Sequence, residues 1–190
     1  MDYLIQLDHQ LFNFINQDLS NSFFDWIMPL IRNKNTWIPF YFLTAVLLFK
    51  TYGKKSLFIV LAVVLSVGLA DGISNHALKP FFERTRPCLL PGFMENVNLV
   101  VSRCSGAYSF PSSHAANHFA IAFLLILIIR KNYSKLSSIL LFWAGIICFA
   151  QIYVGVHFPT DILGGLLIAW LAAVISYSIY RYSVDKINWQ

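Results

Sequence analysis

Five stretches of the chain consist almost entirely of apolar residues, and short polar or basic segments separate them. They cover about residues 36–49 (extending toward 52), 56–78, 112–129, 136–153 and 159–180. A helix needs roughly 20 apolar residues to cross the hydrocarbon core of a bilayer. The pattern therefore predicts an all-α protein, a polytopic transmembrane helical bundle of about five spans, in which residues 1–190 form one domain.

Residues 1–33 have a different pattern. Apolar side chains recur there every three or four positions, with Asp and Asn between them: Leu4, Leu7, Leu11, Phe14 and Ile15. This spacing is typical of an amphipathic helix that lies along a membrane surface. The apolar run at 23–31 is too short to span a bilayer alone and is either tilted or re-entrant.

The composition agrees with a lipid-exposed protein. Only 12% of the residues are charged and 57% are hydrophobic, whereas soluble domains carry about 25% charged residues. The net charge is +5, but the cations fall in short clusters between apolar runs. They indicate topology and an anionic substrate, so we expect no nucleic-acid partner.

Basic residues cluster after the first, third and fifth apolar stretches. The cluster residues are Lys50, Lys54, Lys55, Arg130, Lys131, Lys135, Arg181 and Lys186. Cytoplasmic loops carry an excess of Lys and Arg. We therefore place these ends in the cytoplasm, which puts the N-terminal helix outside and the C-terminus inside.

The loop at about 79–111 carries cations on the opposite, outer side: Lys79, Arg84, Arg86 and Arg103. Connections of this length are often functional. The loop also holds Cys88 and Cys104. In an oxidising compartment the two form a disulfide that fixes the loop, and otherwise they are two unpaired thiols.

By this topology, we expect three polar clusters to lie on the same outer side. The first ends the second apolar stretch (79–87), the second is Phe110-Pro111-Ser112-Ser113-His114, and the third spans 151–161. Cations, free N–H groups at a helix start and two histidines are what a phosphate site needs. Asp161 stands four residues after His157, where its carboxylate is able to fix the imidazole tautomer and leave the other ring nitrogen as nucleophile or base.

These motifs resemble a known family. Lys79-x6-Arg86-Pro87, Pro111-Ser112-Ser113-His114 and Tyr153-x-Gly155-x-His157-x3-Asp161 are similar to the three motifs of the type 2 phosphatidic acid phosphatase (PAP2) superfamily of integral-membrane lipid phosphatases. The resemblance implies that His157 attacks phosphorus, Asp161 orients His157, and His114 protonates the departing oxygen and then activates water.

The resemblance also implies a phosphate cradle. Lys79 and Arg86, with backbone N–H groups near Ser112 and Ser113, would hold the phosphoryl oxygens, and no metal or other cofactor is expected. Two positions depart from the family pattern: Ser113 stands where glycine is usual, and Gln151 where arginine is usual. Gln151 donates only neutral hydrogen bonds to phosphate, and the candidates for the missing charge are Arg84, Arg103 and His118.

Two polar residues within apolar stretches have alternative readings. Asp71 is either functional or paired with a neighbouring helix, because a carboxylate within a span is costly. His118, one turn after His114, either touches phosphate or makes a helix–helix hydrogen bond.

The sequence thus predicts a membrane lipid phosphatase of the cytoplasmic membrane, with its active site on the outer face. Its partners are membrane lipids and an amphiphilic phosphate or diphosphate. Undecaprenyl diphosphate is favoured over phosphatidylglycerol phosphate, phosphatidic acid and lipid A phosphate, because an outer-face site suits recycling of that carrier. A lipid phosphotransferase and a non-catalytic lipid-phosphate binder or transporter are the alternatives; no oligomeric state is predicted.

Overall fold

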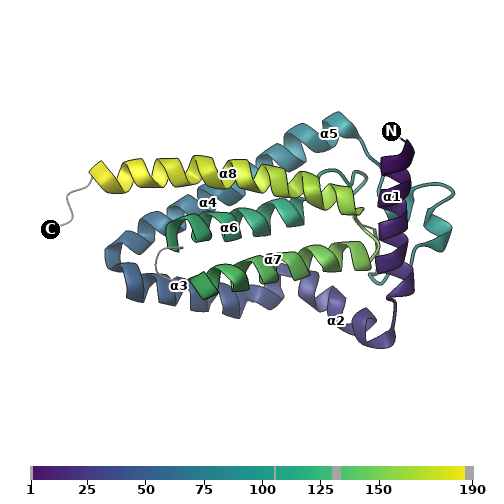
Figure 1. Cartoon of the computed structure of the whole chain (residues 1–190), viewed down its shortest axis with the longest axis horizontal. Helices are drawn as coiled ribbons and strands as arrows, with labels where there is room; N and C mark the ends of the chain where they lie inside the picture. Colours follow the sequence, from purple (N-terminus) through teal and green to yellow (C-terminus); the bar gives the residue numbers. More distant parts are fainter. Residues whose placement is uncertain (1, 105, 130–133, 187–190) are drawn as a thin grey trace.

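The computed structural model describes residues 2–104, 106–129 and 134–186. Its α-helices are α1 (Asp2–Asn13), α2 (Ser22–Arg32), α3 (Ile38–Tyr52), α4 (Ser56–Gly72), α5 (Lys79–Phe82), α6 (Ser113–Ile129), α7 (Ser134–Tyr153) and α8 (Pro159–Lys186). Five of them, α3, α4, α6, α7 and α8, run side by side in an elongated bundle (Figure 1). The all-α expectation is confirmed, and these helices coincide with the five apolar stretches, except that α4 ends at Gly72 rather than 78 and α8 continues to Lys186 rather than 180.

Helix α6 lies inside the bundle, where it packs against α4, α7 and α8. Its buried face is rich in small side chains, because Ala115, Ala116, Ala120 and Ala122 are all fully buried. Small residues let helix backbones approach closely, which is how helices associate in lipid, where burial of apolar surface gives little driving force.

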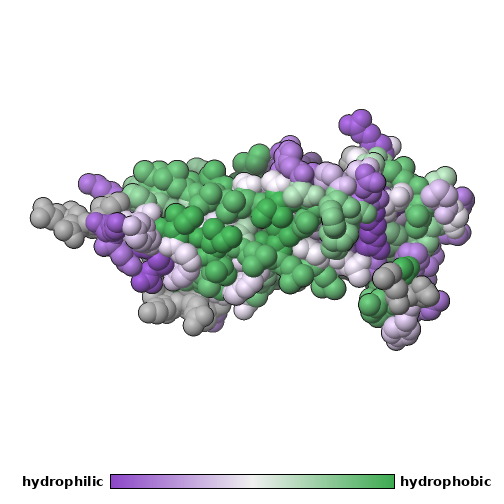
Figure 2. All heavy atoms as spheres, turned by 90° about the horizontal axis from the view of Figure 1, so that it is seen from above, coloured by the Kyte–Doolittle hydropathy of each residue, from purple (hydrophilic) through white to green (hydrophobic). Residues whose placement is uncertain are grey.

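Among the described residues, three helical segments are long and apolar enough to cross a membrane, by length and composition: Lys34–Phe82, Lys135–Tyr153 and Pro159–Lys186. The first contains both α3 and α4, which reverse direction at the turn Gly53–Lys55 (Figure 1). Helix α6 is a shorter apolar helix. The surface is apolar along the middle of the molecule and hydrophilic toward both ends (Figure 2). The basic pair at 130 and 131 lies outside the described residues.

Helix α1 lies across one end of the bundle rather than along it (Figure 1). Four of the five periodic apolar side chains, Leu4, Leu7, Leu11 and Phe14, are exposed, as an interfacial helix requires. The fifth, Ile15, is instead partly buried against the core. The opposite face is buried against the protein, and two of its residues are polar: Asp8 is 3% exposed and Asn16, in the following turn, is fully buried.

The long loop is held to this end of the molecule by polar contacts. The Asn16 side-chain amide donates to the carbonyls of Asn98 (2.8 Å) and Tyr153 (2.7 Å). Within the loop, Cys88 and Cys104 form a disulfide, so the disulfide alternative is confirmed. Helix α2 begins at the side-chain cap of Asn21 and packs Met28 against α7.

Candidate active site

A tight turn between α7 and α8 carries His157. Gly155 has a φ of +86° there, and an added Cβ would lie 2.7 Å from the Val97 side chain and 3.2 Å from the Asn98 carbonyl. Only glycine fits such a conformation with so little room. The turn places His157, which is 2% exposed, beneath the loop.

His157 and Asp161 form the expected pair. His157 Nδ1 lies 3.3 Å from Asp161 Oδ2, and the same oxygen accepts the Phe158 backbone N–H at 2.8 Å. Because a carboxylate only accepts hydrogen bonds, the proton sits on Nδ1 and Nε2 keeps its lone pair. Burial lowers the pKa of His157 to about 4, against the raising effect of Asp161 and with the help of the positive charges of Arg86 and Lys79. The imidazole is therefore neutral at neutral pH, as a nucleophile must be.

Arg86 stands beside the free nitrogen of His157. Its Nη1 lies 3.1 Å from His157 Nε2 and donates to the Val156 carbonyl at 2.9 Å, while Nε donates to the Gly106 carbonyl at 2.9 Å. Burial lowers the pKa of Arg86 to about 10, with a smaller effect from the charge of Arg32. The guanidinium thus remains a cation, held against the atom that would meet phosphorus.

The start of α6 is tied to the start of α8. The Ser112 N–H donates to the Asp161 carbonyl at 3.0 Å, and a Cβ on Gly165 would lie 2.7 Å from both the Ser112 carbonyl oxygen and the Ala115 side chain. This close packing brings His114 within electrostatic range of His157 and Lys79. The three sequence clusters therefore meet, as expected.

Ser113 and Asp71 belong to a polar network between α4 and α6. The Ser113 hydroxyl donates to Asn75 Oδ1 at 2.7 Å, and Asp71 Oδ1 accepts from the amides of Asn75 and Asn117, each at 2.9 Å. Asp71 is thus paired with a neighbouring helix, which is the second of its two readings. The Ser113 side chain is engaged with Asn75, which leaves its backbone N–H for a phosphate.

His118 also makes helix–helix contacts. Its Nδ1 lies 2.8 Å from the His114 carbonyl oxygen and its Nε2 lies 3.4 Å from the Tyr41 hydroxyl, while its ring packs on Trp143 of α7. Both ring nitrogens therefore face protein atoms, in line with the helix–helix reading.

The other two candidates for the missing charge lie elsewhere. Arg84 donates to Asp161 Oδ1 (2.6 Å), to the Thr160 hydroxyl (2.6 Å) and to Asp8 (2.5 Å), so both of its terminal nitrogens are taken up by protein oxygens. Arg103 is exposed and makes no ion pair or hydrogen bond with the residues that the structure describes. Neither guanidinium is placed to receive a phosphate.

A cation that the sequence analysis did not single out, Arg32, acts on the site residues. Arg32, the last residue of α2, is half-buried, and its Nε has no hydrogen-bond partner within the described ranges. Its charge acts on both Arg86 and His114. Gln151 is fully buried, and neither end of its amide has a partner among the described residues. One signal for Arg32 was available in the sequence: the topology predicted from the basic clusters puts this cation on the outer side, where basic residues need an explanation.

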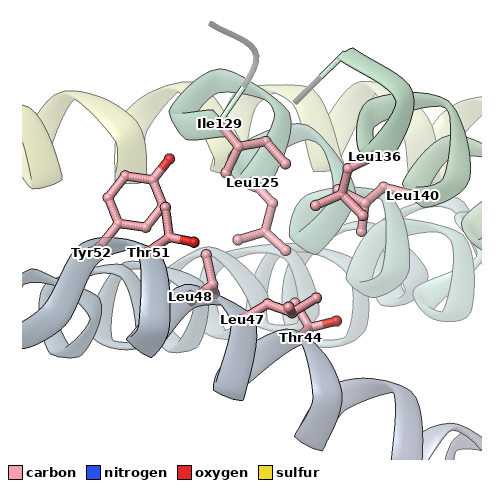
Figure 3. Close-up of a pocket in the computed structure, with 9 residues that line it drawn as sticks. All are labelled: Thr44, Leu47, Leu48, Thr51, Tyr52, Leu125, Ile129, Leu136 and Leu140. Carbon is pink, nitrogen blue, oxygen red and sulfur yellow. The ribbon is translucent and has the colours of Figure 1, made fainter. Parts of the chain in front are cut away.

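The apolar pocket in Figure 3 lies away from the candidate active site. It has a volume of about 120 Å³ and lies between α3, α6 and α7. Leucine and isoleucine side chains such as Leu48, Leu125 and Leu140 line most of it (Figure 3). No histidine or cationic side chain lines it, and none of the site residues described above contributes to it. In the parts of the chain that the structure describes, no group of three His, Cys, Asp or Glu side chains is arranged to hold a metal ion.

Fold and site together define a helical membrane protein with a buried histidine–aspartate pair flanked by cations. The PAP2 superfamily model matches residues 55–185, and the chain belongs to that superfamily; it is a membrane lipid phosphatase.

Two curated relatives are lipid A 4'-phosphatases. That of Porphyromonas gingivalis is 33% identical over 98% of this chain and 78% of its own length, and that of Bacteroides thetaiotaomicron is 32% identical over 94% and 79%. The crystal structure of Aquifex aeolicus LpxE superposes with a TM-score of 0.63 at 29% identity, covering 89% of this chain and 93% of that one.

Proposed function

We propose that this protein hydrolyses a phosphate monoester of a lipid A phosphate through a phosphohistidine intermediate on His157. The observation that carries the chemistry is the pairing of the two ring nitrogens: Nδ1 with Asp161 and Nε2 with Arg86. The substrate class is supported by similarity to lipid A 4'-phosphatases over 98% and 94% of the chain.

In the first step, Nε2 attacks phosphorus and the P–O bond to the lipid breaks. His114 donates a proton to the departing oxygen, so the lipid leaves as an alcohol. In the second step, the same histidine takes a proton from water, whose oxygen attacks the phosphohistidine and releases inorganic phosphate. Phosphoryl transfer depends mainly on positioning and on charge stabilisation. Lys79, Arg86 and the N–H groups at the start of α6 supply the charge and the donors.

The charge that Gln151 lacks comes from Arg32 in this proposal. The side chain enters from α2, which packs on the same helix, α7, that carries Gln151. The unpaired Gln151 amide and Arg32 Nε are groups whose burial is costly until a ligand or water meets them. A phosphate bound between them satisfies both.

The proposal includes an arrangement of the helices in the membrane. Helices α3, α4, α6, α7 and α8 are the five spans, α1 lies in the outer interface, and the site opens to the outer face of the cytoplasmic membrane. The lipid tails then remain in the bilayer while the phosphate reaches His157. Such a site also suits undecaprenyl diphosphate, which is the second candidate substrate.

The test is phosphate release by the purified protein from lipid A, undecaprenyl diphosphate, phosphatidylglycerol phosphate and phosphatidic acid, each with EDTA present. We expect lipid A to be the best substrate and His157→Ala to lower kcat by roughly 10³-fold or more, because it removes the nucleophile. A matched control is His76→Ala, since His76 is exposed in the helical segment Ile73–Leu78 that follows α4.

Each alternative has its own outcome. Transfer of phosphate to an added acceptor lipid, in place of release, supports a phosphotransferase. Binding of lipid A without turnover, unchanged in His157→Ala, supports the non-catalytic binder and contradicts the proposal.

A further inference from the structure

Asp8 of the interfacial helix α1 is buried in contacts with the start of α8. Its Oδ1 accepts the Thr160 backbone N–H at 2.9 Å, and its Oδ2 accepts the Thr160 hydroxyl at 2.7 Å and Arg84 Nη2 at 2.5 Å. Only 3% of Asp8 is exposed. A carboxylate buried this deeply is stable only when it is paired and fully hydrogen-bonded, and Asp8 meets both conditions through residues far away in sequence.

Arg84 connects this carboxylate to the reaction centre. Its Nη1 donates to Asp161 Oδ1 at 2.6 Å, and the other oxygen of Asp161 lies 3.3 Å from His157 Nδ1. The guanidinium also stacks on the Phe158 ring, 4.3 Å from the ring centre. One continuous set of contacts therefore runs from Asp8 of α1 through Arg84 and Asp161 to the imidazole of His157, and we call it the relay.

The charges along this set explain why two carboxylates share one arginine. A guanidinium paired with Asp161 alone would cancel the charge that the imidazole needs when His157 attacks phosphorus. With Asp8 on the same guanidinium, the three groups together carry one net negative charge.

We infer that Asp8 is a positioning residue for the reaction: through Arg84 it fixes Asp161 against His157 and preserves the negative charge beside the ring. The inference rests on the proposed role of His157 as nucleophile. It makes α1 part of the active site, since this helix supplies a group on which the catalytic pair depends.

Other charged and titratable groups also face this region. Arg86 and Lys79 lower the pKa of His157, His114 interacts with it from α6, and Arg32 acts on Arg86 from α2. His9, next to Asp8, stacks on Phe158, and burial lowers its pKa. None of these groups is altered in the variants below, so their effects are constant across the comparison.

The sign of the effect differs between the two ends of the relay. Attack requires an unprotonated Nε2, so kcat/KM falls as the pH drops through the pKa of His157. Asp8→Asn removes a negative charge and lowers that pKa, which moves the acid limb of the profile to lower pH. Arg84→Gln removes a positive charge and moves the limb to higher pH.

The experiment measures kcat and kcat/KM against pH for wild type, Asp8→Asn, Arg84→Gln and the double variant, with phosphate release from the best substrate. We expect opposite shifts of about half a unit to one unit in the single variants and a limb near the wild-type position in the double variant. In Asp8→Asn, kcat should also fall, because a less basic imidazole is a weaker nucleophile. Asp185→Asn, the same change in an exposed carboxylate on α8, is the matched control and should change neither quantity.

Unmoved limbs in both single variants, or shifts in the same direction, overturn the relay, because a merely structural contact changes stability without moving the profile. If Asp8→Asn does not fold, Arg84→Gln decides: its limb must rise while that of Arg84→Lys, which keeps the charge, stays in place. Hydrolysis that persists in His157→Ala refutes the nucleophile itself, whereas hydrolysis that needs His157 and ignores Asp8 and Arg84 refutes only the relay.

Discussion

The electrostatics of the candidate active site depend on which groups each positively charged side chain contacts. Arg86 and Lys79 act on His157, whereas Arg84 is committed to two carboxylates. The family position usually occupied by arginine holds Gln151. Arg32 is the candidate to replace that charge. Its Nε has no hydrogen-bond partner among the described residues, and its charge acts on Arg86. A hydrogen bond to a charged group contributes about 1.5–3 kcal/mol, so the identity of this cation matters for turnover.

We therefore predict that Arg32→Ala lowers kcat/KM by about 10-fold to 100-fold, which is that energy expressed as a rate. Arg32→Lys should recover part of the loss, because the charge remains while the two-pronged geometry does not. Adding Gln151→Arg to Arg32→Ala should also restore activity. Steady-state phosphate release measures all three.

The control for this series is Arg181→Ala, an exposed arginine paired with Asp185. It should leave kcat/KM unchanged. An Arg32→Ala enzyme with wild-type kinetics would show that the site works without a third cation.

At the scale of whole elements, the apolar runs predicted the bundle helices well. Runs of this length have few alternatives to a helix, because every backbone group must be satisfied within the segment. The faces of α1 were harder to predict. Its exposed apolar residues follow the period that marks an interfacial helix, but Asp8, Phe12 and Asn16 form a second period of four that faces the protein. Nothing local distinguishes a carboxylate that meets water from one that meets Arg84.

In the candidate site too, the contacts between residues near in sequence could be predicted and the long-range contacts could not. His157 stands just before α8 and Asp161 in its first turn, four residues apart in the sequence, so their contact is local and could be predicted from the spacing. The contact of Asp8 with Thr160 joins residues 152 positions apart, and the approach of Arg32 depends on how α2 packs on α7. Such contacts come from tertiary packing, which a single sequence pattern does not encode.

One element contact that holds the site together is the crossing of α6 and α8 at Gly165. Gly165→Ala would place a Cβ 2.7 Å from the Ser112 carbonyl oxygen and 3.0 Å from the Ala116 nitrogen, and both are backbone atoms that cannot rotate away. Overpacking of this kind costs about 1–3 kcal/mol. We predict a lower thermal midpoint and a loss of kcat, because the helix start that carries His114 shifts away from His157.

Gly145→Ala in α7 is the matched control. An added Cβ there meets nothing within 4 Å, and alanine favours a helix over glycine by about 1 kcal/mol. This variant should be as stable as wild type or more so, with full activity. Equal thermal midpoints for the two variants, measured in detergent, would mean that the α6–α8 contact yields more readily than its geometry indicates.

The whole molecule has two polar ends of different character. One end holds the α3–α4 turn with Lys54 and Lys55 together with the end of α8, and the other holds α1 and the long disulfide-bonded loop (Figures 1 and 2). The positive-inside rule favours a cytoplasmic place for the first end, and a stable disulfide is typical of the oxidising side. Both arguments support our proposal that the site faces outward. In that proposal a lipid phosphate reaches the site from the outer leaflet.

This orientation predicts which end a membrane-impermeant maleimide reaches. The chain has three cysteines, of which two are disulfide-bonded and Cys148 is buried, so the wild type provides a blank background. Glu95→Cys in the loop and Lys54→Cys in the α3–α4 turn replace exposed residues. In intact spheroplasts we expect labelling of Glu95→Cys alone, and labelling of both after detergent is added. Labelling of Lys54→Cys alone in intact spheroplasts would place the site in the cytoplasm, where its substrate would be the newly made lipid rather than the translocated one.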